Sequence, residues 1–198
     1  MFTSLHHLID GEWMREAYRR TRKDGATGID GVTAADYKKD LEANLDDLLE
    51  RIKSGRYYAP PVRRSYIPKA DGTKRPLGIP TLEDKVAQRA LLMLLEPIYE
   101  TDFLPCSHGF RPGRSAHDAL NALRNGIIEQ RQRWVIDADL KAYFDSIPHA
   151  HLRSFLDLRI KDGVVRRMID KWLKAGVLEE GTVHKPVAGT PQGGVRTP

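Results

Sequence analysis

The spacing of apolar residues along the chain predicts a protein built mainly from helices. Between Thr33 and Gly55, apolar side chains recur at intervals of three or four residues, which places them on one face of a helix. The same periodicity recurs in several other segments. These are predicted as helices and comprise residues 3–23, 81–96, 115–127, 149–158 and about 162–174.

Three segments carry strand signals instead. Residues 62–79 form two short extended runs about Asp71-Gly72, a dipeptide typical of tight hairpin turns. Residues 133–139 contain the strand formers Val135 and Ile136, and residues 176–189 have the pattern of a last hairpin. Helices with a few strands predict an α+β fold.

Local signals also predict helix starts and buried faces. Thr81 with Asp84 three residues later resembles a capping box, and Ser115 has the position of an N-cap. Pro97 is expected to disturb the end of the helix that follows Thr81. The apolar residues of the helix after Ser115 are expected to face inward, and they are Ala119, Leu120, Leu123 and Ile127.

Composition is that of a globular protein without a membrane segment. The 198 residues are 40% hydrophobic and 30% charged, which suits one ordinary domain or two small ones. The longest purely aliphatic run, residues 90–95, is far shorter than the roughly 20 residues of a membrane span. The first residues lack the pattern of a secretory signal, and Cys106 is the sole cysteine. We therefore expect a cytoplasmic protein with no membrane partner.

Charge is segregated along the chain, whose net charge is +5. Residues 51–75 carry eight basic residues and one acid, with three tyrosines among them, whereas residues 36–50 carry six acids and two lysines. Cations interleaved with aromatic rings are typical of surfaces that contact nucleic-acid phosphates. A solvated basic face is the alternative interpretation of residues 51–75.

Carboxylates gather around the predicted strand at 133–139. Asp137 and Asp139 lie in the strand, and Asp145 follows shortly after it. A carboxylate at a strand end suits a hard cation such as Mg²⁺, which typically takes one or two protein carboxylates together with substrate phosphates. A second acid would have to come from elsewhere in the fold. The alternative is that Asp139 caps the next helix or pairs with an arginine.

Four longer blocks make the chain recognisable. They are "YIPKADGTKRPLGIPTLEDKVAQRAL", "LEPIYETDFLPCSHGFRPGRSAHDAL", "WVIDADLKAYFDSIPH" and "GTPQGGV". In their order and spacing, these blocks resemble the N-terminal half of a bacterial reverse transcriptase encoded by a group II intron. "ATGIDGVT" resembles the extra block that precedes the polymerase motifs in that lineage. The resemblance covers about residues 20–195.

The resemblance implies roles for residues of the catalytic centre. Asp139 matches the first metal-binding aspartate, and the backbone carbonyl of Leu140 would be the adjacent ligand of two Mg²⁺ ions. Phe144 matches the bulky residue under the sugar of the incoming nucleotide, where it would exclude a 2′-hydroxyl; core packing is its alternative role. Asp137 and Asp145 match acidic positions that are not metal ligands.

It also implies contacts with nucleotide and nucleic acid. Lys69 and Arg75 match residues that grip the triphosphate, unless they are only solvated strand charges. Gln192 and Gly193 lie in the loop that lets the substrates approach the backbone closely. Contacts with nucleic acid are expected from four arginines of the basic segment and of the "HGFRPGRS" loop, namely Arg63, Arg64, Arg111 and Arg114. His108 and His117 are interpreted as structural residues.

The resulting prediction is an α+β chain of helix-rich fingers and an incomplete palm sheet. We expect an N-terminal helical extension over 1–60, fingers over 61–132 and a partial palm over 133–198. Substrates would be an RNA template, such as intron RNA, a DNA primer and deoxynucleoside triphosphates. The Tyr-x-Asp-Asp motif that supplies the family's other catalytic aspartates does not occur in these 198 residues, so the isolated chain is expected to be inactive.

Two other interpretations stay open from the sequence. The chain could be a non-catalytic RNA-binding module or a decayed remnant, or it could be part of a reverse transcriptase attached to a CRISPR or other defence system. The sequence leaves the oligomeric state undetermined.

Overall fold

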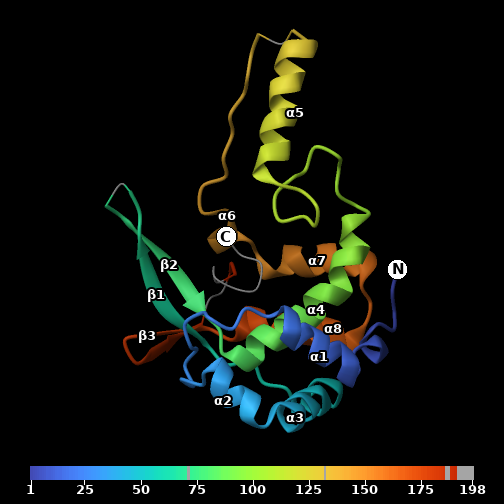
Figure 1. The fold of residues 1–198 in the computed structure, drawn as a ribbon, viewed down its shortest axis with the longest axis vertical. Coiled ribbons are helices and arrows are strands. Elements are labelled where there is room, and N and C mark those ends of the chain that lie inside the picture. Colours follow the sequence, from blue (N-terminus) through green and yellow to red (C-terminus); the bar gives the residue numbers. More distant parts are fainter. Residues whose placement is uncertain (71, 132, 186–187, 191–198) are drawn as a thin grey trace. The chain divides into compact units, whose positions relative to one another are not determined.

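The computed structural model describes residues 1–70, 72–131, 133–185 and 188–190, and it confirms the helix-rich α+β class (Figure 1). The helices described are η1 (His6–Leu8), α1 (Gly11–Arg20), α2 (Ala34–Lys39), α3 (Leu41–Lys53), α4 (Leu82–Glu100), α5 (Ala116–Glu129), α6 (Tyr143–Ser146), α7 (His149–Arg159) and α8 (Gly163–Lys174). The strands are β1 (Val62–Pro68), β2 (Lys74–Ile79), β3 (Val177–Glu179) and β4 (Thr182–His184).

The chain divides into two compact units. The first comprises Met1–Leu94 and Ala142–Pro198, and the second comprises Leu95–Lys141. This grouping follows contacts within the chain, and it differs from the functional division predicted at residues 60 and 132, which stays a prediction.

The first unit contains a four-stranded sheet of order β2-β1-β3-β4. β1 and β2 form the predicted antiparallel hairpin, with Arg63 opposite Ile79 and Pro68 opposite Lys74, and they project from the helices of this unit (Figure 1). β3 pairs in parallel with β1 and in antiparallel with β4, which confirms the predicted hairpin at 176–189.

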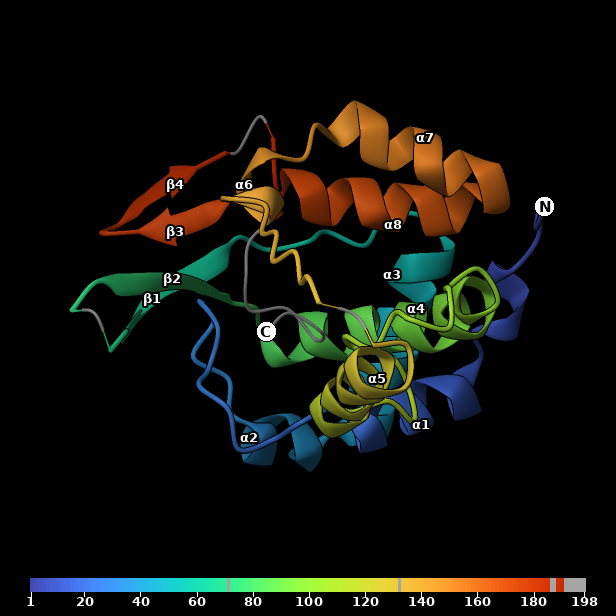
Figure 2. The ribbon, with the colours of Figure 1, turned by 90° about the horizontal axis from the view of Figure 1, so that it is seen from above.

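The core of the first unit is built from the periodic apolar positions. Met14, Leu48, Val86 and Val165 are fully buried, and they come from α1, α3, α4 and α8. α7 runs alongside α8 (Figure 2), and Arg153 of α7 forms an ion pair with Asp170 of α8 at 2.6 Å. Burial of one helical stripe from each element explains why the 3.6-residue periodicity predicted that these segments are helical.

A buried carboxylate joins the foot of the hairpin to two helices. Asp84, in the first turn of α4, accepts hydrogen bonds from the Tyr57 hydroxyl, from Trp172 Nε1 of α8 at 2.6 Å and from Gln88 Nε2 at 2.9 Å. Thr81 Oγ1 accepts from the Asp84 amide, so Thr81 is the N-cap that the sequence predicted. The Asp84 side chain, however, faces the core instead of closing a capping box.

The predicted strand at 133–139 is wrong. Residues 133–140 have no regular secondary structure, and Trp134 and Ile136 are 90% and 92% exposed. A strand needs a neighbour that satisfies its backbone hydrogen bonds, and all four described strands pair with one another instead. The expected start of a palm sheet is therefore absent from the described residues.

The predicted buried face of the helix after Ser115 is also wrong. Ser115 and Asp118 form a complete capping box at the start of α5, yet Leu120 and Leu123 are 61% and 51% exposed. The local signals that start a helix are satisfied within one turn, whereas burial needs a second element. No residue described in α5 is buried.

Three helix boundaries differ from those predicted. The first helix starts at Gly11, because Asp10 caps it by accepting from the Trp13 amide. Asp40 leaves helical geometry and separates α2 from α3. α4 continues through Pro97 to Glu100, so the proline does not end it.

Candidate functional site

The β1–β2 hairpin presents two cations at its distal end. Lys69 closes the turn, where its amide donates to the Thr73 carbonyl at 2.8 Å, and Arg75 stands on β2 opposite Ile67. Both side chains are exposed. An exposed ammonium and an exposed guanidinium on one hairpin can each donate hydrogen bonds to phosphate oxygens.

The two arginines near the foot of the hairpin bind other parts of the protein. Arg63 donates to the Thr27 carbonyl from Nε at 3.1 Å and from Nη2 at 2.7 Å. Arg64 Nε lies 3.6 Å from a carboxylate oxygen of Glu179 on β3. Residues 51–75 thus include exposed cations at the distal end of the hairpin, and two arginines near its foot that bind other parts of the protein. A nucleic-acid contact of Arg63 or Arg64 stays a prediction.

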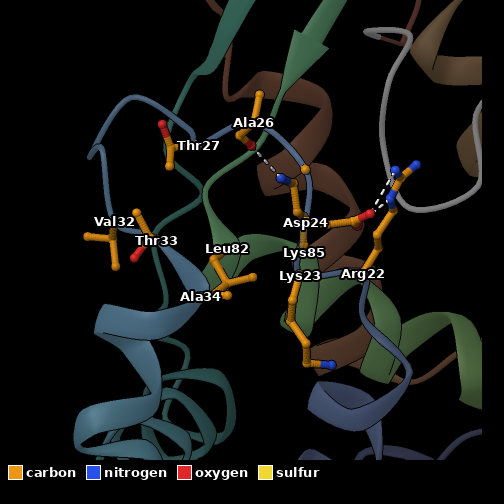
Figure 3. Close-up of a pocket in the computed structure, with 11 residues that line it drawn as sticks. Arg22, Lys23, Asp24, Ala26, Thr27, Val32, Thr33, Ala34, Leu82 and Lys85 are labelled. Carbon is orange, nitrogen blue, oxygen red and sulfur yellow. Dashed lines mark hydrogen bonds and ion pairs between the residues drawn. The ribbon is translucent and has the colours of Figure 1, made fainter.

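A cavity of about 250 Å³ lies beside the loop that contains "KDGATGIDGVT" (Figure 3). Three cations line it, and each has a partner within the protein: Arg22 pairs with Asp24 at 2.5 Å, Lys85 Nζ donates to the Ala26 carbonyl at 3.0 Å, and Lys23 Nζ donates to the Tyr18 carbonyl at 2.6 Å. Burial lowers the pKa of both lysines.

The glycine-rich loop is held against the start of α4. A Cβ at Gly28 would lie 2.5 Å from the Thr81 Cα and 2.6 Å from its amide nitrogen, so the two backbones meet where only glycine fits. The sequence showed a glycine-rich loop here but gave no sign that Lys85, more than fifty residues later, lines the same cavity.

Phe144 lies next to the segment that leads into the predicted substrate loop. It is half-buried on α6, and its carbonyl accepts from the Thr190 amide at 2.8 Å. Gln192 and Gly193 lie outside the described residues. Two blocks of the sequence that are forty residues apart are therefore brought together at Phe144 and Thr190.

Asp139 and Leu140 belong to the second unit, and both are exposed. Within the described residues, no group of three or more His, Cys, Asp or Glu side chains is placed to hold a metal ion. Asp139 therefore offers one carboxylate and Leu140 one carbonyl. These two oxygen ligands suit Mg²⁺, but they are only part of its coordination shell. Mg²⁺ takes its other ligands from substrate phosphates and water.

Arg111 organises its own loop in the second unit. Its side chain is 6% exposed; Nη2 pairs with Glu100 Oε1 at 2.6 Å, and Nη1 donates to the Leu104 and Ser107 carbonyls at 2.8 Å each. Arg114 is exposed on the same loop. The predicted template contacts of both arginines stay predictions, and Arg114 has the more accessible side chain.

The order of these features along the chain matches a known family. The profile described as "Reverse transcriptase (RNA-dependent DNA polymerase)" matches residues 67–198, which include Lys69, β2, Asp139 and Phe144. This chain belongs to the reverse transcriptase family. Members generally use a divalent metal ion, RNA templates and nucleotide substrates.

The curated relatives of this chain include a protein encoded by a group II intron. "Group II intron-encoded protein LtrA" of Lactococcus lactis subsp. cremoris is 39% identical over 100% of this chain and 33% of its own length. "Protein YkfC" of Escherichia coli (strain K12) is 42% identical over 98% of this chain and 52% of its own length. The chain thus spans between a third and about half of these relatives.

A solved structure confirms the fold of this reverse transcriptase chain. A chain of a "Cas6-RT-Cas1--Cas2 complex" superposes with a TM-score of 0.60 and 21% identity, over 98% of this chain and 20% of that chain. At that identity the likeness concerns the fold alone. None of the helices that the structure describes combines the length and the apolar composition that a membrane span requires.

Proposed function

We propose that this chain supplies the fingers and part of the palm of an RNA-directed DNA polymerase of group II intron type. The observation that carries the proposal is the exposed pair Lys69 and Arg75 on the β1–β2 hairpin, since both residues lie within the part of the chain that the family profile matches. Triphosphate oxygens carry the charge that such a pair neutralises. The substrates in this proposal are an RNA template, such as intron RNA, a DNA primer and deoxynucleoside triphosphates. The proposed location is the cytoplasm.

Each site residue has a distinct task in this proposal. Lys69 and Arg75 bind and orient the triphosphate, Phe144 faces the sugar, and Arg114 contacts the template backbone. Asp139 and the Leu140 carbonyl would hold Mg²⁺, which when bound would activate the primer hydroxyl and stabilise the leaving pyrophosphate. Arg111 acts indirectly, because its donors hold the loop that carries Arg114.

The test is the binding of Mg²⁺-dTTP to the 198-residue chain and to its Lys69→Ala/Arg75→Ala variant. We expect the double substitution to weaken binding at least tenfold, because two charge-assisted contacts, each worth about 1.5–3 kcal/mol, are removed. Calorimetric titration at low salt measures this affinity. Lys74→Ala is the matched control, since Lys74 precedes Arg75 and its side chain points to the opposite face of β2.

Equal affinities for the unchanged chain and the double variant would refute the triphosphate role of the hairpin. If the chain still bound structured RNA in that case, the alternative of a non-catalytic RNA-binding module would be favoured. A polypeptide of these residues is not expected to extend a primer. The family resemblance implies three metal-binding aspartates, and of these three the polypeptide contains only Asp139.

A further inference from the structure

Two segments far apart in the sequence are joined by main-chain hydrogen bonds around Phe144. The Gly189 amide donates to the Ile147 carbonyl at 2.8 Å, and the Thr190 amide donates to the Phe144 carbonyl at 2.8 Å. Pro148 and Ala188 form an isolated β-bridge beside them. Residues 188–190 therefore lie alongside residues 144–148.

The fit between the segments requires glycine at position 189. Gly189 has a φ of +81°, and a Cβ there would lie 2.5 Å from the Asp145 carbonyl oxygen and 2.8 Å from its Cα. Both the conformation and the close backbone approach exclude a side chain. Any residue other than glycine at position 189 would therefore prevent the two segments from approaching this closely.

One side chain secures this contact. His149, the first residue of α7, donates from Nε2 to the Gly189 carbonyl at 2.8 Å. The acceptor is a carbonyl, so Nε2 carries the proton, as it does both in one neutral tautomer and in the imidazolium. The His149 ring is half-buried, and its hydrogen bond spans forty residues of sequence.

We propose that His149 is a positioning residue for sugar selection at Phe144. This inference rests on the proposed function, in which Phe144 faces the ribose 2′ position of a nucleoside triphosphate. His149 holds Gly189, Gly189 places Thr190, and the Thr190 amide fixes the Phe144 carbonyl and so the backbone that carries the ring. Steric exclusion of a 2′-hydroxyl depends on the ring's position to within about 1 Å, so a loosened backbone discriminates less well.

The structural half of the inference is tested by amide hydrogen exchange in the 198-residue chain. In His149→Ala, exchange at Gly189 and Thr190 is expected to speed up at least tenfold, with little change in the core of α8. His149→Gln is the matched variant, because its side-chain amide nitrogen reaches the position of Nε2 and can donate to Gly189; exchange there should stay within threefold of the unchanged chain. Unaltered protection in His149→Ala would overturn the inference.

The selectivity half compares the affinities for Mg²⁺-dTTP and for Mg²⁺-ribothymidine triphosphate, which differ only at the 2′ position. Phe144→Ala should lower the ratio of these affinities, His149→Ala should lower it at least threefold, and His149→Gln should leave it unchanged. A shift with Phe144→Ala but none with His149→Ala refutes the role of His149. If Phe144→Ala leaves the ratio of affinities unchanged, sugar selection at Phe144 is refuted, and so is the role of His149. The triphosphate contact of the hairpin is tested separately by the Lys69→Ala/Arg75→Ala variant.

Thermal unfolding of each variant shows whether it is folded. Should His149→Ala fail to fold, His149→Asn replaces it, since the shorter amide keeps polarity but does not reach the Gly189 carbonyl. It is expected to behave as His149→Ala in both measurements, and behaviour like His149→Gln would overturn the proposal.

Discussion

At the scale of single residues, two buried aspartates have opposite electrostatic environments. Asp162 is fully buried, and although burial opposes its ionisation, the amides of Leu5, His6, Val164 and Val165 and the His6 ring hold its pKa below the usual range. Asp84 is also buried, and there the cost of desolvation outweighs its donors and raises its pKa. Burial alone thus does not set the direction of the pKa shift, because Asp162 accepts from five donors and Asp84 from three.

Asp162→Ala is expected to lower the free energy of unfolding by about 3 kcal/mol, because several buried amides lose their acceptor. The depressed pKa of Asp162 adds a pH dependence. Its contribution to stability is complete above the unfolded pKa of about 3.9 and is lost as the pH falls through the folded value. Urea unfolding between pH 2.5 and 7 measures both effects.

Asp10 supplies the control for this prediction. It caps α1 by accepting from one amide, that of Trp13, and it is exposed. Asp10→Ala should cost about 1 kcal/mol or less. Equal losses from the two substitutions would show that Asp162 is an ordinary helix cap.

At the scale of elements, the Asp84 cluster decides how the hairpin is anchored. Asp84 lies in the first turn of α4, which follows β2, whereas Trp172 belongs to α8 and Tyr57 precedes β1. Lys171 of α8 adds a second tie, because its Nζ donates to the Gly55 carbonyl at 2.6 Å. Both ends of the β1–β2 hairpin are therefore fastened to the same two helices.

Asp84→Leu is expected to destabilise the chain by about 3 kcal/mol, since the Tyr57 hydroxyl and the Trp172 indole nitrogen lose a buried acceptor. Asp84→Asn keeps an acceptor oxygen for both and removes the charge. Because the folded pKa of Asp84 is raised, its carboxyl contributes most at low pH and loses stability as the pH rises above about 3.9. Asp84→Asn should abolish that decline.

Thermal unfolding between pH 3 and 8 distinguishes the two Asp84 substitutions. A loss with Asp84→Asn at pH 7 as large as that with Asp84→Leu would show that the negative charge itself is required. The proposed anchoring by neutral donors would then be wrong.

At the scale of the whole molecule, apolar exposure is concentrated in the second unit. Trp134, Val135 and Ile136 are exposed there, as are four apolar residues of α5, namely Leu120, Leu123, Ile127 and Ile128. The first unit buries most of its large apolar residues between helices. The two units therefore contribute unequally to stability, because burial of apolar area is the main favourable term in folding.

This exposure predicts binding of the apolar dye ANS by the folded chain. Trp134→Ser/Ile136→Ser should reduce ANS fluorescence by at least a third and shift the unfolding free energy by no more than about 0.5 kcal/mol, as is usual for surface substitutions. Val183→Ser, at an exposed apolar position of the first unit, is the matched control. Unchanged fluorescence in the double variant would mean that residues 134–136 are covered in solution.

Features that depend on residues close together along the chain could be predicted before the structure was known. The helical stripe at Leu45, Leu48 and Ile52, the β1–β2 hairpin and the Ser115 cap were all predictable, because their interactions close within a turn or between adjacent strands. The family was predictable for another reason: four motif blocks in one order are a long and specific signal.

Features that depend on a partner far away in the sequence became visible in the folded chain. Val135 and Ile136 have strand propensity but no described neighbour to pair with, and the apolar stripe of α5 has no described element to bury it. Conversely, nothing local marks Asp84 as the acceptor of Tyr57 and Trp172, or His149 as the donor to Gly189. A buried polar group forms its hydrogen bonds with the groups that the fold brings next to it. The distance between two residues along the sequence does not tell which groups these will be.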